Sequence, residues 1–285
     1  MPATSIRRVP STNGVQLALH DLGGGGPTLL FAHATGFHGW VWSPIAERLA
    51  DTYHCLAIDF RAHGDSTPPD DLSFDWEGFG DDVEAVLDSL DATGPLYGVG
   101  HSMGGAALLL AEQRRPGTFT KLYCFEPIVI DTRGRSVPVG IDDHPLAVGA
   151  RRRRETFGSL AEALENYRSK PPLNSIAPEA LQAYVRHGFD ELPDGSVRLK
   201  CRGEHEAAVY YMSTTNDVFE HLAKVRCPVV IAAGPAHDGG PGAFAAPIAE
   251  ALPAGTFERH DHLGHFGPLE QPGFVAAEIR RAFRT

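Results

Sequence analysis

The chain has 285 residues, of which 42% are hydrophobic and 21% are charged, so it can bury a large core and is neither disordered nor fibrous. Its 36 acidic and 25 basic residues give a formal net charge of −11, which disfavours nucleic acid and anionic membranes as partners. No apolar run approaches the roughly 20 residues that cross a bilayer. Because residues 1–11 hold no apolar signal segment and the four cysteines show no C-x-x-C spacing, we expect a cytoplasmic protein with reduced thiols.

The first part of the chain alternates predicted strands with predicted helices. Apolar patterning predicts strands over residues 14–22, 28–32, 54–59, 96–99 and 122–125, and helices over residues 76–90 and 102–115. This alternation is typical of a mostly parallel sheet with helices on both faces.

After Ile130 the pattern changes to helical segments interrupted by proline and glycine, with a turn at Asp194-Gly195. Strands are predicted again over residues 228–233 and 256–259, and helices over 243–252 and 274–283. The sequence therefore predicts an α/β fold with a mostly parallel, doubly wound sheet. We expect residues 1–130 and 226–285 to form its core, and residues 131–225 to form an inserted helical cap over the carboxyl edge of the sheet, where ligands of such folds bind.

The segment Gly100–Gly104 matches the pattern G-x-S-x-G between a predicted strand and a predicted helix. A sharp turn in this position strains the serine backbone and brings neighbouring chain close, so small residues must flank the serine. The turn lifts the Ser102 hydroxyl above the sheet, and the amides of the following helix face any anion formed there. Ser102 is the predicted nucleophile.

A serine hydroxyl needs an adjacent base, and His265 is the candidate because it follows the last predicted strand in the loop before the final helix. A zinc site formed by His260, His262 and His265 is the alternative interpretation of this region. The sequence shows no evident fourth zinc ligand, and strand alternation points the His260 side chain away from the other two histidines. We therefore expect no metal.

These motifs resemble those of the α/β-hydrolase fold family, in the same order along the chain. The resemblance covers residues 14–130 and 226–283 and is carried by residues 31–37, residues 59–66, the turn at Ser102, and residues 264–266 with Glu270 and Pro272 behind them. Two positions depart from the usual family pattern, since Ala34 and Ala62 stand where glycine is usual. Alanine is small enough that we expect both loops to be retained.

The resemblance implies that the amides of Thr35 and Met103 form an oxyanion hole. It also implies that His33, His63 and His101 are structural hydrogen-bonding residues rather than catalysts.

The acid that would orient His265 has two candidates. Most family members place it in the loop after the strand at residues 228–233, which here offers Asp238. A minority, including lactone hydrolases of the zearalenone lactonase type, place it after the strand that follows the nucleophile helix, where this chain has Glu126. We favour Glu126, because an unpartnered glutamate at the end of a buried strand is costly, whereas an aspartate in a surface loop needs no special role.

The substrate pocket has several candidate residues. Phe37, Trp40 and Trp42 follow the oxyanion segment and are candidates for its wall or for packing beneath the cap, and His101 adjoins the nucleophile. Four consecutive arginines, residues 151–154, could meet an anionic substrate, but helical geometry turns most of them towards water.

Together these features predict a cofactor-independent serine hydrolase that cleaves a carboxylic ester or lactone of a small molecule. A carbon–carbon bond hydrolase or a cofactor-free peroxidase is the alternative within enzymes, because one fold hosts many reactions. A small-ligand receptor is the alternative from another class. We expect neither nucleic acid nor membrane as a partner, and the sequence leaves a homodimer open.

Overall fold

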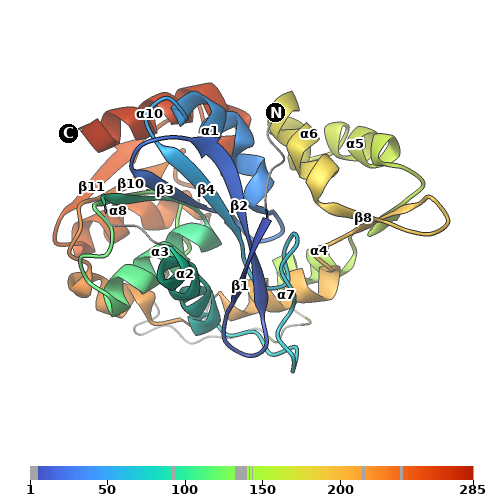
Figure 1. Cartoon of the computed structure of the whole chain (residues 1–285), viewed down its shortest axis with the longest axis horizontal. Coiled ribbons are helices and arrows are strands. Elements are labelled where there is room, and N and C mark those ends of the chain that lie inside the picture. Colours follow the sequence, from blue (N-terminus) through green and yellow to red (C-terminus); the bar gives the residue numbers. More distant parts are fainter. Residues whose placement is uncertain are drawn as a thin grey trace.

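The computed structural model describes residues 6–90, 94–131, 140, 142, 144–213, 216–237 and 240–284. Its large sheet consists of β1 (Ile6–Pro10), β2 (Gln16–Gly24), β3 (Thr28–Ala32), β4 (His54–Asp59), β5 (Leu96–His101), β6 (Lys121–Phe125), β10 (Val229–Ala233) and β11 (Gly255–Arg259). These eight strands lie in the order β1-β2-β4-β3-β5-β6-β10-β11 (Figure 1). Strand β2 pairs antiparallel with β1 and β4, and the other neighbours pair parallel. This is the predicted mostly parallel α/β sheet.

Helices cover both faces of the sheet. They are η1 (Gly39–Trp42), α1 (Ser43–Leu49), α2 (Glu77–Ser89), α3 (Met103–Arg114), η3 (Val218–Lys224), α8 (Gly242–Ala251), α9 (Gly267–Glu270) and α10 (Pro272–Arg284). Strand alternation separates two hydrophobic clusters: Phe31 of β3 packs with Ile45 of α1 and Ile279 of α10, whereas Leu30 packs with the residues of α2 and α3. Figure 1 shows α1 and α10 together on one side of the sheet and α2 and α3 on the other.

Most predicted elements of the core are present. The bounds of β3 and β4 are those expected, because both strands are continuous buried apolar runs. The sequence predicts neither β1 nor α1. Strand β1 lies at the sheet edge with only Val9 buried, so its residues lack the alternation that marks a half-buried strand.

The chain between β6 and β10 contains α4 (Pro145–Arg151), β7 (Thr156–Phe157), α5 (Leu160–Arg168), η2 (Leu173–Ser175), α6 (Pro178–His187), β8 (Phe189–Glu191), β9 (Val197–Leu199) and α7 (Gly203–Met212). Most of its elements are helices, and β7, β9 and β8 add a small antiparallel sheet that the sequence analysis does not predict. The Asp194-Gly195 turn joins β8 to β9, and Gly195 adopts a φ of 83°. Figure 1 shows α5, α6 and β8 standing beside the large sheet. No helix in the described ranges is long and apolar enough to cross a membrane.

Candidate active site

Ser102 lies in the turn between β5 and α3, with its backbone at φ 54° and ψ −118°. This conformation is strained for any residue with a side chain. A Cβ atom on Gly100 would lie 2.5 Å from Cα of Gly105, and one on Gly104 would lie 2.2 Å from the carbonyl oxygen of Ala32. Only glycine fits at either position, which explains physically why this turn has the sequence G-x-S-x-G.

Glu126 and His265 form a hydrogen-bonded pair beside this turn. Glu126 directly follows β6, and its Oε2 atom lies 2.7 Å from Nδ1 of His265 in the loop between β11 and α9. The second oxygen, Oε1, accepts a hydrogen bond of 2.9 Å from the amide of Gly234. The Glu126 side chain is 4% exposed and that of His265 is 30% exposed, so the carboxylate is sequestered while the imidazole is open on one side. The carboxylate thereby fixes the ring orientation of His265.

The sequence offers two candidates for the acid that orients His265, and the structure describes one of them, Glu126. The expected pairing of Glu126 with His265 is present, and the loop after β10 contributes the Gly234 amide that holds the carboxylate. Asp238, the alternative candidate, lies outside the described residues.

His101 connects the serine turn to the histidine loop. Its Nε2 atom donates a hydrogen bond of 2.8 Å to the backbone carbonyl oxygen of His265. Burial, reinforced by the neighbouring His265, lowers the pKa of His101 well below its usual value, so the ring is neutral and serves as a donor. The residue before the nucleophile therefore anchors the loop that carries the candidate base.

Thr35 and Met103, the predicted oxyanion residues, lie side by side. The Thr35 hydroxyl is 3.5 Å from the sulfur of Met103. Met103 is the first residue of α3, so its amide has no partner within the helix. The pair therefore lies next to the Ser102 turn, as a hole for an anion requires.

His33 supports the loop that carries Thr35. One ring nitrogen, Nδ1, hydrogen-bonds the carbonyl oxygen of Ala34 at 2.8 Å, and the other, Nε2, accepts from the amide of Phe60 at 3.0 Å. Burial lowers the pKa of His33 to about 3, so the ring is neutral. His63 is likewise buried and bonds the carbonyl oxygen of Arg61 at 2.9 Å. Both residues make the structural hydrogen bonds that the sequence analysis expects of them.

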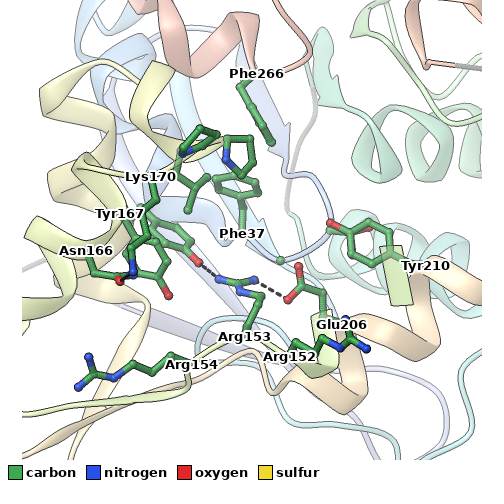
Figure 2. Close-up of a pocket in the computed structure, with 16 residues that line it drawn as sticks. Phe37, Arg152, Arg153, Arg154, Asn166, Tyr167, Lys170, Glu206, Tyr210 and Phe266 are labelled. Atoms are coloured by element: carbon green, nitrogen blue, oxygen red, sulfur yellow. Dashed lines mark hydrogen bonds and ion pairs between the residues drawn. The ribbon is translucent and has the colours of Figure 1, made fainter. Parts of the chain in front are cut away.

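A cavity of about 400 Å³ opens beside Thr35 (Figure 2). Its lining comes from the oxyanion loop, the histidine loop and the insertion: Thr35, Gly36, Phe37, Arg152, Arg153, Arg154, Asn166, Tyr167, Lys170, Pro171, Pro172, Leu173, Tyr184, Glu206, Tyr210 and Phe266. Phe37, a predicted pocket residue, is part of this lining. Its ring packs on Tyr184 and Phe266, with centroids 5.2 and 5.6 Å away.

The other predicted wall residues are engaged elsewhere and are not part of the cavity lining in the described ranges. Trp40 stacks on His187, with ring centroids 4.4 Å apart. Trp42 is buried against Phe31 at 5.1 Å, in the core. His101 faces the backbone of His265, as described above.

The histidines of the alternative zinc interpretation do not converge. His260 and His262 both contact the ring of Phe274, with centroids 5.1 and 4.6 Å away, while His265 faces Glu126. Among the residues that the structure describes, the groups whose ligand atoms come within 4.8 Å of one another do not include His265.

A model of the alpha/beta hydrolase family matches residues 29–278, which is most of the chain. The chain belongs to this family. The family assignment confirms the resemblance and the fold predicted from the sequence. Of the two positions that depart from the usual motifs, Ala62 occupies the left-handed region, at a φ of 60°, where glycine is favoured.

Curated relatives of this alpha/beta hydrolase align over a part of its length. A stretch of 105 residues, 35% of this chain and 38% of the relative, is 34% identical to the Karrikin insensitive 2 receptor CA of Petunia hybrida. A stretch of 102 residues, 36% of this chain and 37% of the relative, is 30% identical to a pimeloyl-(acyl-carrier protein) methyl ester esterase of Methylococcus capsulatus. The matched part of the chain spans little more than a third of the length of these relatives.

Among solved structures, that of E-2-(acetamidomethylene)succinate hydrolase matches with a TM-score of 0.78 and 20% identity, covering 99% of this chain and all of that one. This match shows the shared fold. The family and its esterase-named relatives together support a hydrolase activity.

Sequence reasoning about this alpha/beta hydrolase misses the cavity residues of the insertion. Tyr167, Tyr184 and Glu206 come from α5, α6 and α7, and no motif marks them. The run of four arginines is the one sequence feature that points to this part of the cavity, because Arg153 belongs to the run and lines the cavity.

Proposed function

We propose that this alpha/beta hydrolase is a serine hydrolase that cleaves a carboxylic ester or lactone through an acyl-enzyme. The observation that carries the proposal is the 2.7 Å hydrogen bond between Glu126 and His265, next to a serine held in a strained turn. A base oriented by a buried carboxylate is what a serine hydroxyl needs to become a nucleophile at neutral pH.

In the proposed reaction the Ser102 oxygen attacks the substrate carbonyl while Nε2 of His265 takes the serine proton. The negative charge of Glu126 stabilises the resulting imidazolium. The amides of Thr35 and Met103 hold the oxyanion, and collapse of the tetrahedral intermediate expels the alcohol, which receives the proton from His265. Water, deprotonated by His265, then releases the acyl group and regenerates Ser102. Every step of this reaction uses only residues of the chain and water.

A small-ligand receptor that uses the same cavity is the second candidate, favoured by the similarity to a protein named as a karrikin-insensitive receptor. The two functions differ in turnover. A hydrolase releases many product molecules per protein molecule, whereas a receptor that modifies its ligand once stops after one equivalent.

Activity on p-nitrophenyl esters of increasing acyl length, and on aromatic and macrocyclic lactones, tests the proposal. We expect repeated turnover of at least one ester or lactone by the wild-type protein. The Ser102→Ala variant should lose on the order of 10⁴ to 10⁶ in kcat while remaining folded. A folded Ser102→Ala protein that keeps a tenth of the wild-type rate would exclude this mechanism, and release of a single equivalent would favour the receptor.

A further inference from the structure

The cavity beside Thr35 is positively charged although the chain as a whole is acidic. Four cationic side chains, those of Arg152, Arg153, Arg154 and Lys170, line it together with a single carboxylate, that of Glu206. The whole chain, in contrast, has 36 acidic and 25 basic residues. A cleft lined by one sign of charge concentrates ligands of the opposite sign.

Two of these cations are neutralised and two are not. Arg153 forms an ion pair with Glu206, and Arg154 pairs with Glu162 at 2.7 Å. Lys170 donates a hydrogen bond of 2.6 Å to the neutral amide oxygen of Asn166. In the part of the chain that the structure describes, neither Lys170 nor Arg152 forms an ion pair. The cavity therefore carries net positive charge when it is empty.

Arg153 is fixed in the middle of this wall (Figure 2). Its guanidinium donates to the carboxylate of Glu206 and, at 2.6 Å, to the hydroxyl of Tyr184, and its side chain is only 21% exposed. A guanidinium has five N–H donors, so these contacts leave capacity for a further acceptor. Because the side chain is already held, binding a planar anion costs little additional rotamer entropy.

The hydroxyl of Tyr167 also lacks a partner. It is buried, lines the same cavity next to the Arg153 guanidinium, and makes no hydrogen bond of good geometry within the described ranges. A buried hydroxyl without a partner costs free energy, which a ligand oxygen at this place would recover.

This polar wall is close to the predicted oxyanion hole. A Cβ atom on Gly36, the residue after Thr35, would lie 3.3 Å from Nη1 of Arg153 and 2.5 Å from Oε1 of Glu206. Phe37 and Phe266 form the apolar part of the cavity, next to the histidine loop. A ligand with an anion on the wall and a carbonyl at Thr35 therefore needs only a short linker, and Phe37 and Phe266 in the lining favour an apolar one.

We propose that the substrate is an ester or lactone that also carries a carboxylate. A short apolar spacer separates this carboxylate from the ester or lactone bond that is cleaved. The carboxylate binds against Arg153, Lys170 and Tyr167, and Arg152 adds to the positive field. This substrate class rests on the proposed hydrolase function, since it places the reacting carbonyl at Thr35 and Ser102.

Paired esters that differ only in charge test the substrate class. One pair carries the charge in the acyl part: the p-nitrophenyl monoester of adipic acid against p-nitrophenyl heptanoate. The other carries it in the alcohol part: meta-acetoxybenzoate against meta-acetoxytoluene. We expect the wild-type protein to prefer the anionic member of at least one pair by about tenfold in kcat/KM, as a charge-assisted contact allows. Added salt should reduce this preference.

Variants connect the preference to the cavity. Lys170→Gln and Tyr167→Phe should each lower the ratio of anionic to neutral kcat/KM by about threefold, and a double Arg152→Gln/Lys170→Gln variant should bring it close to one. Arg168→Gln is the matched control, because Arg168 is two residues from Lys170, pairs with Glu165 on the surface and is outside the cavity lining. It should leave the ratio unchanged.

Titration of the inactive Ser102→Ala protein with the same esters separates the two proposals, because it measures binding without turnover. If the anionic ester binds more tightly than its neutral partner and Lys170→Gln weakens that binding, the substrate class is supported. Absence of product release by the wild-type protein would overturn the hydrolase function, but it would leave this support for the substrate class intact. Hydrolysis of both members of each pair at equal rates, with equal binding, would overturn the substrate class and leave the hydrolase function intact.

Discussion

Nδ1 of His265 and Oε2 of Glu126 lie 2.7 Å apart although the two residues are separated by 139 positions in the sequence. Glu126 adopts a φ of 43°, in the left-handed region that residues with side chains seldom occupy. Its amide donates to the carbonyl oxygen of Ala232, and its Oε1 accepts from Gly234, so β10 holds the backbone and the loop directly after β10 holds the carboxylate. The strained backbone and these two bonds aim the carboxylate at the histidine.

Glu126→Gln should lower kcat by on the order of 10³ to 10⁴, because the amide keeps the shape of the carboxylate but not the charge that stabilises the imidazolium. Asp238→Asn is the matched control and should retain most of the activity. Steady-state rates of both variants on the best ester decide between the two acids. Loss of activity in Asp238→Asn with little effect in Glu126→Gln would assign the acid to the loop after β10.

Ser102→Gly should make the protein inactive but more stable than Ser102→Ala. The backbone of Ser102, at φ 54° and ψ −118°, is strained for serine and for alanine but accessible to glycine. Relief of the strain, about 1–3 kcal/mol, exceeds the extra entropy of glycine in the unfolded chain, about 0.5–1 kcal/mol. The free energies of unfolding, measured by urea denaturation, should differ by roughly 1 kcal/mol. Equal stabilities would show that the turn is not strained.

The parts of this molecule that the sequence predicts are those set by local rules. Strand β4 is a continuous buried run, and Gly100 and Gly104 are required by contacts within the turn itself. Strand β1 cannot be predicted from the sequence pattern, because an exposed edge strand needs no alternation of apolar and polar residues.

The cavity wall could not be predicted for a different reason. Whether Arg153 faces the cavity or the solvent depends on Glu206, which is 53 residues away, and on Tyr184. The expectation from helical spacing is wrong here, because α4 ends at Arg151 and the other three arginines of the run line the cavity. Arg151 and Arg154 form ion pairs with neighbouring carboxylates.

Gly104→Ala should disrupt the site while an alanine elsewhere does not. A Cβ atom at this position would lie 2.2 Å from the backbone oxygen of Ala32, so α3 or the oxyanion loop must move. We expect a loss of about 1–3 kcal/mol in stability, together with a large fall in kcat. Gly149→Ala in α4 is the control, because the methyl group meets nothing within 4 Å and alanine favours the helix. Similar melting temperatures for both variants would contradict the close contact.

Stability should fall as the pH is lowered from about 6.5, well above the range in which carboxylates titrate. Burial lowers the pKa of His33 to about 3 and that of His38 to about 4, from an ordinary value of 6.5. Protonation of His33 would place a hydrogen on Nε2, which accepts from the amide of Phe60. In His38, Nε2 lies 3.0 Å from the carbonyl oxygen of Tyr184, and a second proton on Nδ1 would find no partner among the described residues.

Below pH 6.5 the unfolded chain therefore takes up protons on these histidines while the folded chain does not, so the free energy of unfolding decreases with acidification. Each of the two should contribute a loss on the order of 1 kcal/mol for the first pH unit below 6.5, and the loss should end near the folded pKa values. Asp59 acts in the same direction but at lower pH: burial raises its pKa, contact with His20 outweighs this and lowers it, and its contribution to stability is lost only below about pH 3.8. Urea denaturation at pH 7.5, 6.5, 5.5 and 4.5 measures the slope. His38→Gln, whose amide can still donate to Tyr184, should reduce the slope by about one proton. A stability that stays constant from pH 7.5 to 4.5 would show that these buried histidines titrate as they do in the unfolded chain.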